Sequence, residues 1–178
     1  MNEDERRRAF ADAFIAQARS DWGVYRVLAM QEGVVVCHSL HYLQMSCEKL
    51  AKAYRLRDTD SPLDELISKH TGFAKFVGPF FSRVLKDEYP GKDAQLARLI
   101  REARARAREI EKLAPAIDRA GAPENAEYPW ERDGRVIAPC HHLFPSLELL
   151  RNPAGRAFLN LIERALKDFE RLNPRLFR

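Results

Sequence analysis

Polar side chains of several chemical types line one face of a predicted helix between residues 36 and 54. They recur at intervals of three and four residues, which places them on one helical stripe: His38, His41, Met45, Glu48 and Lys52. Two imidazoles one turn apart can bind a metal ion or share a proton near neutral pH. The stripe is therefore a candidate binding site. The favoured interpretation is nevertheless a set of core-edge or interface groups that hydrogen-bond to neighbours, with Glu48 and Lys52 as an ion pair one turn apart.

A second stripe of the same helix is apolar and predicts its buried side. Its members alternate at spacings of four and three: Val36, Leu40, Leu43, Cys47, Leu50 and Tyr54. We expect this face to pack against the core of a helical bundle and to hold the polar stripe beside it.

Residues 45–53 also carry a family resemblance. The run Met-Ser-Cys-Glu-Lys-Leu-Ala-Lys-Ala resembles the Gln-Ala-x-Glu-Lys-x-Leu-Lys-Ala signature in the second helix of HEPN domains (higher eukaryotes and prokaryotes nucleotide-binding). Met45 stands where the signature has glutamine, and Ser46 where it has alanine. His70 and the tract 123–130 are similar to further family features, and together the matches span residues 10–172.

The resemblance implies a nucleotide- or RNA-associated domain. It further implies a prokaryotic toxin-antitoxin or phage-defence setting, a homodimer and a possible cognate partner of the nucleotidyltransferase type. We expect no cofactor. The residues that we expect to contribute to binding are His38, His41, Met45, Glu48, Lys49, Lys52 and His70.

Many HEPN proteins are ribonucleases that use an arginine followed four to six residues later by a histidine. Arg135 stands five residues before His141 and six before His142. A guanidinium can hold the scissile phosphate while an imidazole moves the proton of the attacking 2′-hydroxyl. Here, however, Val136 follows the arginine and Pro139 interrupts the segment. We therefore expect a non-catalytic binding or assembly module, with a metal-independent ribonuclease as the alternative.

A metal-binding helical bundle is a remote alternative. Cys140, His141 and His142, joined by His38 or His41, have the right ligand types for zinc. No Cys-x-x-Cys pair accompanies them, and we expect no metal.

Composition points to one helical domain over residues 1–178. The chain is 46% hydrophobic and 31% charged, with a net charge of +4 that permits an anionic partner without requiring one. No apolar run reaches the roughly 18 to 20 residues that span a bilayer, and the N-terminal segment lacks the pattern of a secretory signal. We expect a cytoplasmic protein with three reduced cysteines and no membrane contact.

The predicted fold is an all-α, up-and-down bundle of four to five helices with a long extended connector before the last helix. The first two helices cover residues 4–30 and 36–54, and a third begins at 61–64 and is broken or kinked at Thr71-Gly72 and Gly78-Pro79. A fourth runs from Leu96 to Ile117, with Pro115 near its end, and the last begins at Asn152-Pro153 and extends to Leu172.

The connector over residues 121–145 is rich in proline and glycine, and loops of this length are usually functional or packed. We expect four of its side chains to pack onto the bundle: Tyr128, Trp130, Val136 and Phe144.

The fourth helix carries two features that bear on partners. Ala103 and Ala107 in its apolar stripe favour close helix packing, from which we expect self-association. A strip of arginines on another face suits phosphate: Arg101, Arg104, Arg106 and Arg108. Because Glu102, Glu109 and Glu111 interleave with them, a solvated face with helical ion pairs is the favoured interpretation.

Overall fold

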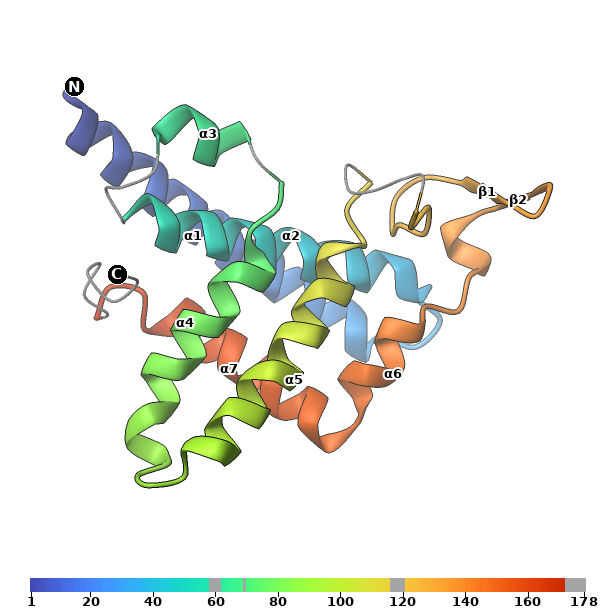
Figure 1. Cartoon of the computed structure of the whole chain (residues 1–178). Coiled ribbons are helices and arrows are strands. Elements are labelled where there is room, and N and C mark those ends of the chain that lie inside the picture. The colour runs from blue at the N-terminus through green and yellow to red at the C-terminus, as the bar shows by residue number, and fades with distance from the viewer. Residues whose placement is uncertain (58–61, 69, 116–120, 172–178) are drawn as a thin grey trace.

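The structure is a computed structural model that describes residues 1–57, 62–68, 70–115 and 121–171. Within these residues it contains seven α-helices and one two-stranded hairpin (Figure 1). The predicted all-α bundle is confirmed, and two short helices bring the number above the four to five expected. No helix in the described part of the chain is both long and apolar enough to cross a membrane.

Helices α1 (Glu3–Met30) and α2 (Val36–Leu56) form a long antiparallel pair at one side of the bundle (Figure 1). A capping box starts α1: the Asn2 side chain accepts from the Glu5 backbone N–H, and the Glu5 carboxylate accepts from the Asn2 N–H, both at 2.9 Å. Ser46 Oγ donates to the Ala18 carbonyl at 2.8 Å, which fixes the two helices against each other. The apolar stripe of α2 is buried as predicted, apart from half-buried Val36.

A short helix α3 (Leu63–Ser68) precedes α4 (Phe73–Leu85), so the predicted break at Thr71-Gly72 is confirmed. Gly72 has a φ of 146°, a conformation that disfavours residues with a side chain. Pro79 does not end the helix, because α4 continues through it. Pro79 and Lys75 are both exposed, so the carbonyl that loses its donor can be hydrated.

The 3-10 helix η1 (Lys86–Glu88) leads into α5 (Asp93–Glu111), which returns antiparallel to α4 (Figure 1). The helix ends before Pro115, and predicted Ile117 lies outside the described residues. Ala103 and Ala107 are buried by the chain's own helices, so they serve packing within the chain and cannot supply a surface for a second copy.

Helices α6 (Pro145–Arg151) and α7 (Pro153–Lys167) complete the bundle. Asn152 caps α7 as predicted, since its side chain accepts from the Gly155 N–H at 2.8 Å. Tyr54 on α2 donates to the Ala165 carbonyl on α7 at 2.8 Å, inside an aromatic cluster with Phe76, Phe80 and Phe169. Predicted Leu172 lies outside the described residues.

The connector is more ordered than an extended arm. Strands β1 (Trp130–Arg132) and β2 (Arg135–Ile137) pair antiparallel with Trp130 opposite Ile137, and the 3-10 helix η2 (Pro139–His141) follows. Trp130 and Phe144 are buried, as predicted. The same prediction is wrong for Tyr128 and for Val136, which is 78% exposed.

Candidate functional site

Glu48 is the centre of a polar cluster that joins α2 to the segment after α3. One oxygen, Oε1, lies 3.0 Å from both His70 Nδ1 and Lys52 Nζ, and Oε2 accepts from the Gln44 amide at 3.1 Å. The Glu48 side chain is only 13% exposed, whereas that of His70 is 57% exposed. The structure therefore brings together three of the predicted binding residues, with the imidazole facing solvent.

The two lysines of the α2 motif are held inside the bundle. Lys52 Nζ also donates to the Ile67 carbonyl at 2.9 Å and lies over the ring of Phe14. Lys49 Nζ contacts Asp21 on α1 at 2.5 Å, and both side chains are largely buried. Breaking such a buried pair from one side is costly, because the remaining charge loses its partner. These lysines are therefore fixed by structural contacts.

The cavity beside this cluster is small. It is bounded by Glu48, Lys52, Arg55 and Gly72 and encloses about 10 Å³, the size of roughly one water molecule. A nucleotide does not fit there. The cluster can present a hydrogen-bonding imidazole at the surface, but it does not enclose a ligand.

The histidines at the start of the polar stripe lie apart from the Glu48 cluster. His38 is exposed and Met45 is half-buried. His41 Nδ1 lies 3.3 Å from Glu127 Oε1, a contact that ties α2 to the connector. The six side chains predicted on α2 thus comprise one connector contact by His41, the ion-paired Glu48, Lys49 and Lys52, an exposed His38 and a half-buried Met45.

The structure does not join Arg135 to either histidine of the expected catalytic pair. Arg135 is exposed on the hairpin opposite Arg132. His142 Nε2 lies 3.4 Å from Glu124 Oε2, and its ring packs edge-on against Trp130 and Phe144 at centroid distances of 5.1 and 4.8 Å. His141 is exposed. Among the described residues, no hydrogen bond links Arg135 to His141 or His142.

The zinc alternative finds no support in the described part of the chain, where no three His, Cys, Asp or Glu side chains are grouped closely enough to hold a metal ion. Cys37 lies near Cys140, and burial together with that second thiol raises the pKa of Cys37. Burial likewise raises the pKa of Cys47. Both buried groups are held as neutral thiols, which are poor nucleophiles and poor metal ligands.

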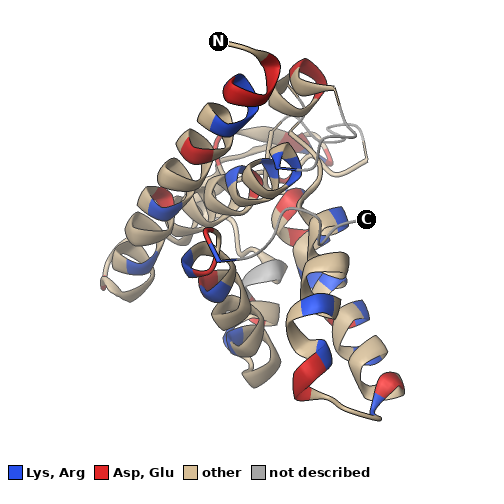
Figure 2. Ribbon diagram, turned by 90° about the vertical axis from the view of Figure 1, so that its left-hand side faces the viewer, with Lys and Arg blue, Asp and Glu red and all other residues tan. Residues whose placement is uncertain are grey.

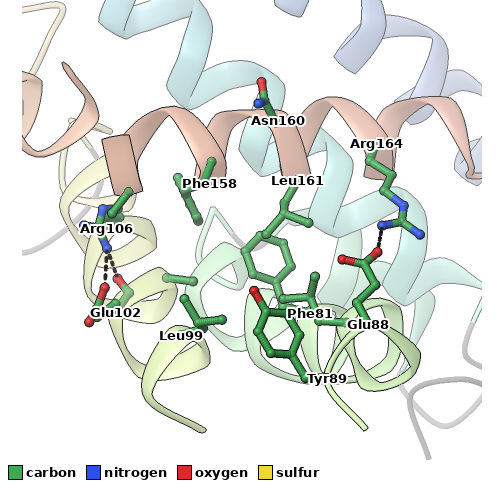
Figure 3. A pocket seen from close by; sticks show the side chains of 14 residues that line it. Phe81, Glu88, Tyr89, Leu99, Glu102, Arg106, Phe158, Asn160, Leu161 and Arg164 are labelled. Carbon is green, nitrogen blue, oxygen red and sulfur yellow. Dashed lines mark hydrogen bonds and ion pairs between the residues drawn. The ribbon is translucent and has the colours of Figure 1, made fainter. Parts of the chain in front are cut away.

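A pocket between α4, α5 and α7 was not predicted. It encloses about 360 Å³, within the usual range of small-molecule sites. Figure 3 shows Phe81, Phe158 and Leu161 against it and the Tyr89 hydroxyl pointing inward. Ion pairs close both ends: Arg164 with Glu88 at 2.5 Å and Arg106 with Glu102 at 3.7 Å. No sequence motif marks it, because its walls come from the consecutive helices α4 and α5 together with α7, which is distant in the sequence.

Comparisons of the chain with protein-family models, with curated proteins and with solved structures find no match.

Proposed function

We propose that this chain is a HEPN-like, nucleotide- or RNA-associated binding and assembly module without catalytic activity. The binding half of the proposal is supported by the resemblance of residues 45–53 and by the excess of 30 Lys and Arg over 26 Asp and Glu. The setting that the resemblance implies belongs to the same proposal: a cytoplasmic homodimer of a toxin-antitoxin or defence system, with a nucleotidyltransferase-type partner.

One observation carries the non-catalytic half. Proton transfer needs a base within hydrogen-bond reach of the reacting group, and phosphate transfer needs a cation beside it. The ring of His142 instead packs edge-on against Trp130 and Phe144, and its Nε2 lies 3.4 Å from Glu124 Oε2 without forming a hydrogen bond. Arg135 lies on the exposed hairpin without a hydrogen bond to either histidine in the described residues. In the described part of the chain, Arg135 therefore forms no preassembled pair with His141 or His142 for cleavage.

A metal-independent ribonuclease is the second candidate. It is favoured by the exposure of both Arg135 and His141 on the same connector, where both side chains are accessible to RNA. In that mechanism Arg135 holds the phosphate and His141 or His142 moves the proton.

RNA cleavage and RNA binding, measured separately on the same protein, distinguish the candidates. We expect the purified chain to bind single-stranded RNA in fluorescence anisotropy and to leave it intact in the presence of chelator. Cleavage by the wild type that is lost in the variant His141→Ala, His142→Ala would establish the ribonuclease instead. If the protein neither binds nor cleaves RNA, both candidates are wrong.

A further inference from the structure

Three arginines of α5 form an exposed strip on a face away from the apolar pocket. Arg101, Arg104 and Arg108 are all exposed, and with Ala97 and Ile100 they line a shallow hollow of about 400 Å³. At about 100° per residue, this face lies nearly half a turn around α5 from the residues that line the pocket. Arg106, the fourth arginine of the predicted strip, belongs to the pocket side.

The glutamates that interleave with these arginines in sequence are engaged elsewhere. Glu102 lies 3.9 Å from Arg98 and 3.7 Å from Arg106, and Glu109 lies 2.9 Å from Lys112. Glu111 accepts hydrogen bonds from the backbone at the start of α4. The expected ion pairs of a solvated face therefore do not form at the strip. Within the described residues, no carboxylate pairs with Arg101, Arg104 or Arg108.

Figure 2 shows acidic and basic residues interspersed over the helices, so charge of one sign does not dominate the molecule as a whole. Most arginines with exposed side chains elsewhere have partners, such as Arg26 with Glu163, Arg151 with Glu148 and Arg171 with Asp168. An unpaired run of three is thus a local feature of α5 and not a consequence of the overall charge.

Gly78 on α4 shapes the middle of the strip. The guanidinium of Arg104 occupies the space that a side chain at position 78 would fill. The arginine therefore lies across the α4 backbone, which restricts its position. Along the helix axis, the Cα atoms of Arg101, Arg104 and Arg108 are separated by about 4.5 and about 6 Å at 1.5 Å per residue.

We propose that Arg101, Arg104 and Arg108 bind successive phosphates along the backbone of single-stranded RNA. This inference rests on the proposed function and names its binding surface. A mononucleotide offers phosphate at one end only, whereas a row of three free guanidiniums matches a chain of phosphodiesters. None of the described residues that line the hollow is aromatic, so the strip follows the backbone without stacking on bases and binds independently of sequence.

The test compares two triple variants that remove the same charge. The strip variant is Arg101→Gln, Arg104→Gln, Arg108→Gln, and the matched control is Arg26→Gln, Arg151→Gln, Arg171→Gln. The probe is a short fluorescein-labelled oligouridylate, titrated at several salt concentrations. Each lost phosphate contact should reduce the steepness of the plot of log association constant against log salt concentration by about 0.7. The strip variant, which loses three contacts, should therefore have a slope smaller in magnitude by about 2 and an affinity about a hundredfold lower near 0.1 M salt. The control should stay within about threefold of wild type.

Single variants and circular dichroism keep the result interpretable. Arg101→Gln and Arg108→Gln should each lose about fivefold near 0.1 M salt, with unchanged helicity and melting temperature because these side chains support no other residue. If wild type binds RNA and the strip variant binds equally well, the three arginines are not the binding surface, while the proposed function stands. If both triple variants lose affinity equally, binding depends on the overall positive charge and not on the strip, and the proposal for the strip is wrong. If wild type binds no RNA, the proposed function fails together with the strip.

Discussion

Glu111 at the end of α5 contacts the start of α4, the preceding α-helix in the sequence. Its Oε1 accepts the backbone N–H groups of Gly72 at 2.6 Å and of Phe73 at 3.0 Å. These donors belong to the first turn of α4, where no residue of α4 itself supplies a side-chain cap. A carboxylate at this position also interacts favourably with the helix dipole. Glu111 therefore takes the role of an N-cap residue from another helix.

We predict that Glu111→Ala lowers the free energy of unfolding by about 1–2 kcal/mol, the usual cost of losing an N-terminal cap. The matched control is Glu109→Ala, which removes only a surface pair with Lys112 and should change stability by less than about 0.5 kcal/mol. Urea unfolding followed by circular dichroism measures both. Equal stability of the two variants would show that the cap contributes nothing.

Tyr25 gives the chain a sensitivity to alkaline pH. It packs against Trp22 at a ring distance of 5.1 Å, and burial raises the pKa of its hydroxyl to about 12, with a smaller contribution from Cys47. Burial also raises the pKa of Tyr54. In the unfolded chain tyrosine ionises near pH 10, so above that pH the unfolded state releases protons that the folded state retains.

We therefore predict that stability is constant with respect to Tyr25 below about pH 10 and falls between about pH 10 and pH 12. Tyr25→Phe should make this fall shallower without abolishing it, since Tyr54 contributes in the same direction. Urea midpoints measured in steps across this range are the test. An identical pH dependence in wild type and variant would contradict the assignment.

Side-chain partners on the same helix can be predicted from the sequence, whereas partners on different helices cannot. Spacing on one helix places Glu48 beside Lys52, and that pair is present at 3.0 Å. The pair between Asp21 and Lys49 depends on how α1 and α2 are aligned, and the cap by Glu111 on how α4 meets α5. Neither alignment is encoded by a local pattern, so these contacts required the structure.

At the scale of elements, the connector is held by its aromatic side chains. The ring of Trp130 lies 5.1 Å from that of His142 and 6.4 Å from that of Phe144, and both Trp130 and Phe144 are buried. The hairpin that carries Trp130 turns at Asp133 and Gly134, which both have positive φ angles of 52° and 70°. The tryptophan thereby attaches the hairpin to the rest of the connector.

We predict that Trp130→Ala destabilises the protein by about 3 kcal/mol, at the lower end of the range for buried tryptophans, because the site lies in a connector and can partly collapse. Limited proteolysis should then cut between residues 121 and 145, where we expect the wild type to resist. Val136→Ala on the same hairpin removes only an exposed side chain and should behave as wild type. A Trp130→Ala protein with wild-type protease resistance would mean that other contacts hold the connector.

Long elements with a sustained period were predictable, and short ones were not. Helices α1, α2, α5 and α7 follow apolar stripes of several turns, and their predicted starts lie within a few residues of the observed ones. Helix α6 has only seven residues, too few to establish a period. The β-hairpin has three-residue strands, but its Asp133-Gly134 turn is a recognised hairpin signal that the frequent prolines and glycines of the connector obscured.

At the scale of the whole molecule, the burial of the α5 alanines changes the argument for self-association. Ala107 is 0% exposed and Ala103 is nearly as buried, so both contact the chain's own helices. The proposed homodimer must therefore use another surface. Exposed apolar side chains near the turn between α1 and α2 include Val27, Met30 and Val35, and nothing in the structure indicates what contacts them.

We predict that Ala107→Leu lowers the free energy of unfolding by about 1–3 kcal/mol, because added methyl groups in a filled core force neighbouring side chains apart. Its sedimentation coefficient under native conditions should match that of the wild type. Ala105→Leu is the matched control, since position 105 is exposed on the same helix and should change stability by less than about 0.5 kcal/mol. If the alanines formed a contact between copies, Ala107→Leu would instead give a monomer, and its loss of stability relative to the dimeric wild type would increase with protein concentration. Sedimentation velocity and urea unfolding at two protein concentrations separate the two outcomes. If the alanines pack only within one chain, the unfolding midpoint of the variant differs from that of the wild type by the same amount at both concentrations.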